Sequence, residues 1–135
     1  MTVVDVRTVP APPHDGALPM LSTSLSSAAM EELLGARLGG VTVRSCVPCY
    51  VRYKPGTNCI VQYRLTVEDH ASGEVHELSA HVKLYTEGRA RRVWSGGALR
   101  ALAEQVSPRV PFARAAYLPE LDAVLQIYPV DVALP

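Results

Sequence analysis

The stretch Cys59-Ile-Val-Gln-Tyr-Arg-Leu-Thr-Val-Glu68 decides the fold class. Apolar residues at every second position from Cys59 to Val67 alternate with polar residues from Gln62 to Glu68. Because successive side chains of a strand point to opposite faces, this period of two predicts a strand with one face in the core and the other in water. Such half-buried strands are typical of antiparallel sheets.

Two neighbouring segments have the composition of pairing partners for this strand. Residues 41–53 are of extended type and contain Pro48, which suits an edge strand or a bulge. Downstream, the alternation returns at Leu78, Ala80, Val82 and Leu84. The turn-like segments Lys54–Asn58 and Asp69–Gly73 separate the three strands. The sequence therefore predicts three consecutive antiparallel strands.

Helical spacing occurs on both sides of these strands. Before them, Ser26 and Ser27 precede a first helix that Gly39-Gly40 ends. Its apolar positions are Met30, Leu33, Leu34 and Leu38. A second helix is expected after Gly88, weakened at Gly96-Gly97. Its apolar stripe comprises Ala90, Val93, Trp94, Ala98, Ala101 and Leu102. We expect this stripe, with Trp94 as its largest side chain, to face the core.

Prolines mark the remaining boundaries. Residues 10–19 contain four prolines and one glycine, which exclude a helix or an inner strand, so residues 1–25 are interpreted as a Pro-rich N-terminal arm. Two further strands are expected near residues 112–118 and 123–128. The sequence thus predicts an α+β domain over residues 26–135. It consists of a five-stranded, mostly antiparallel sheet with one packed helix, and an N-terminal helix and the Pro-rich arm precede it.

Composition excludes several classes of function. The 135 residues, 48% of them hydrophobic, are enough for one domain with its own core. Thirteen basic residues balance thirteen acidic ones, so no overall charge favours nucleic acid or an anionic membrane as a partner. The three cysteines, in a chain that begins without a secretory leader, predict free thiols in a reducing compartment. We therefore expect a cytoplasmic protein.

The remaining motifs favour structural roles. Cys46 and Cys49 have the spacing of a metal or redox motif, but no second pair of cysteines or histidines follows at the interval of a zinc site. The histidines form no pair four residues apart. The arginines between Arg89 and Arg114 give a local positive charge, which we interpret as a solvated helix face. No metal site is predicted.

Lys83 is the principal candidate for a functional residue. It lies on the polar side of the third predicted strand, directly before a loop and the second helix. In kinases a lysine in this position holds nucleotide phosphates, and a helical glutamate orients it. The runs VRYKPGTNCIVQYRL (51–65) and AHVKLY (80–85) resemble the N-terminal lobe of aminoglycoside phosphotransferase-like enzymes, relatives of the protein kinases. The run LQIYPVDVALP (125–135) is similar to the strand and linker that follow in that lobe.

The resemblance, which covers residues 41–135, implies a set of nucleotide-binding residues. Lys83 would bind phosphates of ATP, together with magnesium, beneath a covering turn at residues 54–58. The other implied ligand residues are Lys54, Gly56, Thr57, Asn58, Glu104, Tyr128 and Val130. Among them, Glu104 is the candidate for the orienting helix acid. The chain departs from the protein-kinase form because it lacks G-x-G-x-x-G and carries His81 where kinases have a small alanine, which leaves adenine less room.

Two functions therefore remain open. The resemblance implies the nucleotide-binding small lobe of a kinase-like phosphotransferase that acts on a hydroxyl of a small molecule. The catalytic and metal-binding aspartates of that superfamily belong to the large lobe, so no catalytic residue is assigned and these 135 residues alone are expected to be inactive. The alternative is a non-catalytic α+β interaction module. It would bind a protein or a second copy of itself through a sheet edge or the surface that a large lobe would cover.

Overall fold

The computed structural model describes residues 2–4, 16–98, 101 and 114–129. Its helices are α1 (Leu21–Ser24), α2 (Ser27–Arg37), α3 (Arg89–Ser95) and the 3₁₀ turn η2 (Pro119–Leu121). Its strands are β1 (Thr2–Val4), β2 (Val41–Lys54), β3 (Asn58–Asp69), β4 (Val75–Leu84), β5 (Ala115–Leu118) and β6 (Ala123–Pro129). The domain is of the α+β class, as predicted.

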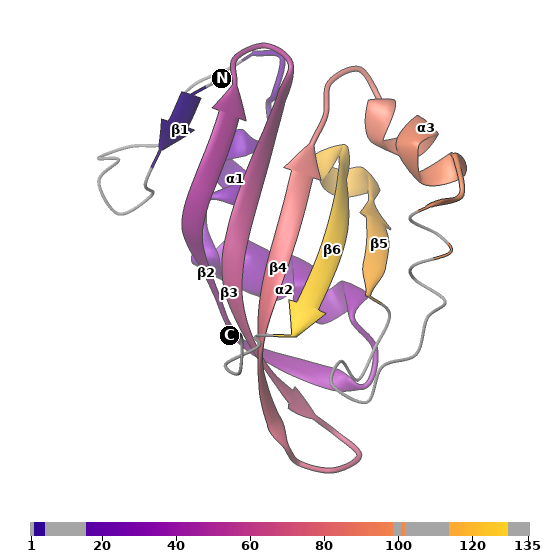
Figure 1. Cartoon of the computed structure of the whole chain (residues 1–135). Coiled ribbons are helices and arrows are strands. Elements are labelled where there is room, and N and C mark those ends of the chain that lie inside the picture. The colour runs from indigo at the N-terminus through magenta and orange to yellow at the C-terminus, as the bar shows by residue number, and fades with distance from the viewer. Residues whose placement is uncertain (1, 5–15, 99–100, 102–113, 130–135) are drawn as a thin grey trace, which may run out of the picture.

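The strands form one antiparallel sheet in the order β1-β2-β3-β4-β6-β5 (Figure 1). The five predicted strands are confirmed as β2 to β6. The structure adds β1, which was not predicted and which pairs with Val51, Arg52 and Tyr53 of β2. Since β6 lies between β4 and β5, the last strand among the described residues is an inner strand of the sheet.

The alternation in β3 has the predicted consequence. Every second side chain, at Cys59, Val61, Tyr63, Leu65 and Val67, is fully buried. The pairing of β2 with β3 shifts register between Val43 and Ser45 and again between Pro48 and Tyr50. Pro48 therefore lies beside a bulge, which is one of the two settings that its sequence position suggested.

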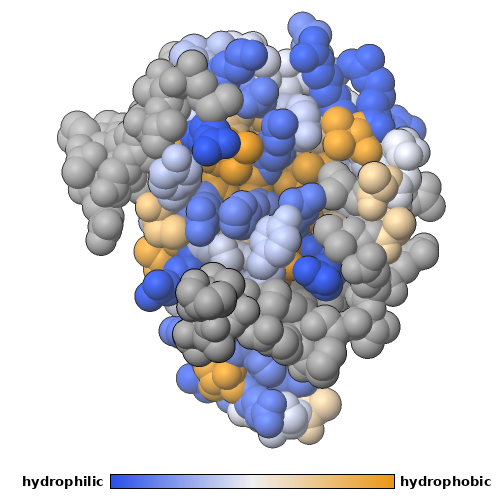
Figure 2. All heavy atoms as spheres, viewed as in Figure 1, coloured by the Kyte–Doolittle hydropathy of each residue, from blue (hydrophilic) through white to orange (hydrophobic). Residues whose placement is uncertain are grey.

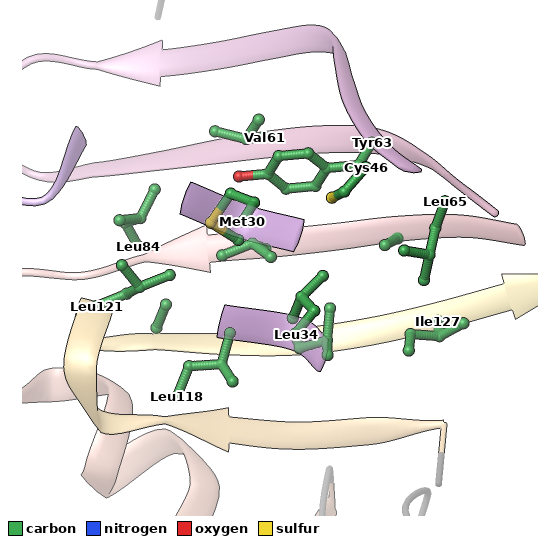
Figure 3. Packing of buried hydrophobic residues seen from close by; sticks show 14 of the residues in the cluster. Met30, Leu34, Cys46, Val61, Tyr63, Leu65, Leu84, Leu118, Leu121 and Ile127 are labelled. Carbon is green, nitrogen blue, oxygen red and sulfur yellow. The ribbon is translucent and has the colours of Figure 1, made fainter. Parts of the chain in front are cut away.

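One helix, α2, covers one face of this sheet. The Ser26 side chain accepts a hydrogen bond from the Ala29 N–H at 3.3 Å and caps the helix, as its sequence indicated. Met30 and Leu34 are fully buried, and Figure 3 shows both among the core residues of the sheet. The helix that packs on the sheet is therefore α2, the helix predicted before the strands, and not the one predicted after them. In α3 only Ala90 is buried, whereas Trp94 is half-buried, so the expectation of a core tryptophan is wrong.

The segment before α2 is also part of the core. The sequence analysis assigned residues 1–25 to an arm, but Leu18 and Leu21 are buried and Ser24 is fully enclosed. The Tyr63 hydroxyl donates a hydrogen bond to the carbonyl of Ser24, and the Ser24 hydroxyl donates to the Leu21 carbonyl at 2.6 Å. Burial raises the pKa of Tyr63, which keeps its hydroxyl protonated as a donor. The end of α1 is therefore packed against β3 through Tyr63.

Tyr63→Phe is expected to lower the free energy of unfolding by about 1–3 kcal/mol, because the substitution leaves the enclosed Ser24 carbonyl without its donor. Urea denaturation followed by circular dichroism measures the change. Tyr117→Phe, at a half-buried position of β5, is the control and should change the free energy by less than about 0.5 kcal/mol. Equal changes in the two variants would contradict the role of the Tyr63 hydroxyl.

Candidate functional site

Lys83 belongs to the face of the sheet opposite α2. Its neighbours in β4, Val82 and Leu84, point into the core, whereas Lys83 is half-buried on the other face. In the sheet it lies between Ile60 of β3 and Val124 of β6. This face is turned to the viewer in Figure 2, where hydrophilic residues alternate with hydrophobic patches. The predicted placement of Lys83 on the polar face of its strand is therefore correct.

The Lys83 ammonium lies over an aromatic ring. Its nitrogen is 5.1 Å from the centre of the Tyr85 ring, within the range of a cation–π contact. Within the described ranges, no carboxylate forms an ion pair with Lys83. Glu104, the predicted orienting acid, lies outside the described residues, as does Val130. Among the described residues, the contact recorded for the Lys83 ammonium is thus the one with the Tyr85 ring.

The hairpin between β2 and β3 forms the predicted turn. The Thr57 N–H donates to the Lys54 carbonyl at 3.1 Å and closes it. Gly56 has φ +70, a left-handed conformation that residues with a Cβ seldom adopt, so the tip needs a glycine here. Lys54 and Gly56 are exposed, whereas Thr57 and Asn58 are half-buried.

An open groove of about 480 Å³ separates this hairpin tip from α3. Its lining residues are Thr57, Asn58, Tyr85, Arg89, Arg92 and Val93. In Figure 1 the hairpin tip and α3 flank the loop that leaves β4. The groove brings two predicted residues, Thr57 and Asn58, together with Tyr85 and, through the Tyr85 ring, with the Lys83 ammonium. Lys54 and Gly56 belong to the same hairpin but do not line the groove.

Asp122, in the turn between η2 and β6, fixes the α3 side of the groove. Its carboxylate accepts hydrogen bonds from the N–H groups of Gly88, at 2.8 Å, and of Ala90, at 3.1 Å. Its own carbonyl accepts from the Tyr85 N–H at 2.8 Å. One residue therefore positions both the first turn of α3 and the aromatic residue in the groove.

Tyr128 lies farther along the same face, away from the groove. It is opposite Ser79 in the pairing of β4 with β6, four residues before Lys83. Its hydroxyl donates to Gln126 at 2.6 Å, and its ring meets the His81 ring edge-on at 5.2 Å. His81 in turn shares a hydrogen bond of 3.2 Å with the Ser79 hydroxyl. These residues form a polar network where the resemblance implies the adenine side of the site.

The stability of the fold is expected to depend on the protonation of His81. Burial lowers the pKa of His81 below the usual histidine value of 6.5, so the folded state disfavours the imidazolium. The free energy of unfolding is therefore highest, as far as His81 is concerned, above the pKa that this residue has in the unfolded chain. It declines as the pH falls through 6.5 toward the lower pKa of His81 in the folded state. Thermal unfolding between pH 8 and 5 measures this. His81→Gln should lose less stability over that interval than the wild type, whereas His70→Gln, at an exposed position, should follow the wild type.

The sequence analysis missed the two arginines of the groove. Arg89 and Arg92 lie three residues apart in α3 and were interpreted as part of a solvated face. The sequence shows that both arginines follow Gly88 at the start of the helix. It does not show that they lie across a groove from the hairpin tip, which is more than thirty residues earlier in the chain. That proximity depends on the packing of the sheet.

The cysteine motif adds no site. Cys46 is buried in the core and Cys49 is exposed, so the two thiols do not share one environment. Within the described part of the chain, no group of three or more histidine, cysteine or acidic side chains is arranged to hold a metal ion. Over the same residues, no helix has the length and apolar character needed to cross a membrane.

Comparisons with known proteins returned no relative: no family model, no curated protein and no solved structure matches this chain. The proposals below therefore depend on the residues and geometry of the chain itself and on the resemblance noted in its sequence.

Proposed function

We propose that this chain is the nucleotide-binding small lobe of a kinase-like phosphotransferase that acts on small-molecule hydroxyls. The observation that carries the proposal is the position of Lys83, half-buried on the face of the sheet opposite α2 and beside the groove at the β2–β3 hairpin. The order of elements supports it: a hairpin, a strand bearing the lysine, a helix and two further strands. This is the plan that the sequence resemblance implied.

The chemistry of the groove supports a phosphate ligand. Lys83, Arg89 and Arg92 supply positive charge, and the hydroxyl of Thr57 and the amide of Asn58 supply further donors. Phosphate oxygens accept charge-assisted hydrogen bonds from such groups. His81 and Tyr128, which the resemblance implies to be on the side of the nucleotide base, are in edge-on contact farther along the same face. ATP with magnesium is the proposed ligand, and three cysteines that form no disulfide bond support a reducing, cytoplasmic setting.

Titration calorimetry with ATP and magnesium tests this function. Lys83→Ala is expected to weaken binding at least about tenfold, because a hydrogen bond to a charged group contributes about 1.5–3 kcal/mol. Arg64→Ala is the matched control, since it removes one positive charge from an exposed position of β3. Its affinity should stay within about twofold of the wild type.

Absence of binding by the wild type, or equal losses in the two variants, would contradict nucleotide binding at Lys83. The non-catalytic interaction module is then the remaining interpretation. Sedimentation at several protein concentrations, over a range of about tenfold or more, detects the self-association that this module predicts.

A further inference from the structure

Arg89 and Arg92 of α3 line the groove, and their surroundings differ from those of the arginines that are held in ion pairs. Arg37 forms a two-point ion pair with Glu120, and Arg44 pairs with Glu68 at 3.0 Å. No described carboxylate pairs with Arg89 or Arg92, although both line the groove. Arg89 and Arg92 thus line one groove, and no carboxylate of the described residues forms an ion pair with either. Each guanidinium group has up to five hydrogen-bond donors.

The other residues that line the groove also favour an anionic ligand. It contains no acidic side chain, and its polar members are Thr57, Asn58 and Tyr85. The Lys83 ammonium lies beside Tyr85, so a third cation borders the groove. The volume of about 480 Å³ is in the range of small-molecule sites, about 300–1,000 Å³. A chain of several phosphate groups matches this combination of size and charge better than a single small anion does.

We propose that this groove binds a chain of phosphate groups and that Arg89 and Arg92 are its ligands on α3. Both side chains extend from a helix whose first turn is held by the Asp122 carboxylate, so the two guanidinium groups have a fixed base. The hairpin tip supplies Thr57 and Asn58 from the opposite side. Identification of the bound chain with the phosphates of ATP rests on the proposed function, whereas binding of the phosphate chain itself does not.

Inorganic tripolyphosphate is the probe that isolates this site, because it has no base or sugar. Titration calorimetry at constant salt compares the wild type with Arg89→Gln and Arg92→Gln. Each variant is expected to lose at least about tenfold in affinity, the effect of one charge-assisted hydrogen bond. Arg91→Gln is the control: Arg91 is exposed on the same helix and does not line the groove, so its loss should be about twofold or less.

Each possible result of this titration either supports or overturns the proposed phosphate site. Tripolyphosphate binding that depends on Arg89 and Arg92 supports the site, even if ATP binds no better and the nucleotide function fails. No binding of tripolyphosphate to the wild type overturns it. Equal losses in the Arg89, Arg91 and Arg92 variants also overturn it, because they indicate attraction to the overall charge of the helix. Circular dichroism checks that the variants are folded, which the exposure of all three arginines favours.

Discussion

Leu34→Ala is expected to lower the free energy of unfolding by about 2–5 kcal/mol, which is the usual cost of removing a fully enclosed leucine side chain. Leu34 has 0% exposure and lies on the face of α2 that packs on the sheet (Figure 3). The substitution removes apolar contacts and leaves a cavity that the antiparallel strands are too constrained to fill. Urea denaturation followed by circular dichroism measures the loss.

Glu32→Ala is the control for this experiment. Glu32 is exposed on the same helix, and the new residue is again alanine, so helix propensity cannot account for a difference. Its free energy of unfolding should change by less than about 0.5 kcal/mol. A loss below about 1 kcal/mol for Leu34→Ala would contradict the packing of α2 against the sheet.

In the folded protein, Cys49 is expected to react with a thiol reagent far faster than Cys46 and Cys59. Cys49 is exposed, whereas the other two are fully buried. Burial, with a smaller effect of the Glu31 charge, raises the pKa of Cys46 to about 12 from 9.0. Because the thiolate is the reacting species, this shift alone lowers its reactive fraction roughly a thousandfold at neutral pH.

Mass spectrometry of the alkylated protein measures this difference. One adduct is expected under native conditions, and three are expected after denaturation, one for each cysteine. Cys49→Ser should abolish the native adduct and leave the other two in the denatured chain. Rapid native labelling of Cys46 would show that this part of β2 opens to solvent, contrary to the core described here.

The sheet could be predicted because one of its faces is buried. In β3 and β4, burial of one face forces apolar residues into every second position, and the pattern is long enough to read. The same reasoning gave α2 from the spacing of Met30 and Leu34. Strand β1 could not be found in this way, since a pairing of three residues leaves too short a pattern.

Two parts of the chain, one in the core and one outside it, were assigned to the wrong environment for a related reason. Leu18 and Leu21 lie in or next to a proline-rich stretch, which argues against regular structure but not against burial. Trp94 lies at a helical spacing that suits a core helix, yet α3 is only seven residues long and buries Ala90 alone. The local sequence pattern indicates whether a segment is a helix or a strand. Whether a residue is buried depends on which other elements pack over it.

The candidate site could be predicted only in part. Lys83, Thr57 and Asn58 were recognised because a sequence resemblance assigned them a role, and the structure brings the two hairpin residues to one groove beside the lysine. Arg89 and Arg92 join them through contacts between segments distant in sequence. Nothing in the local pattern distinguishes them from Arg91, which does not line the groove.

The interior position of β6 has a consequence for how the protein is made. Residues 123–129 reach the ribosome exit after every other described strand, yet they fill the space between β4 and β5. Until they emerge, the hydrogen-bonding edge of β4 has no partner from β6, and β5 has no place to dock. A nascent chain at this stage carries an open strand edge, which is a known template for aggregation.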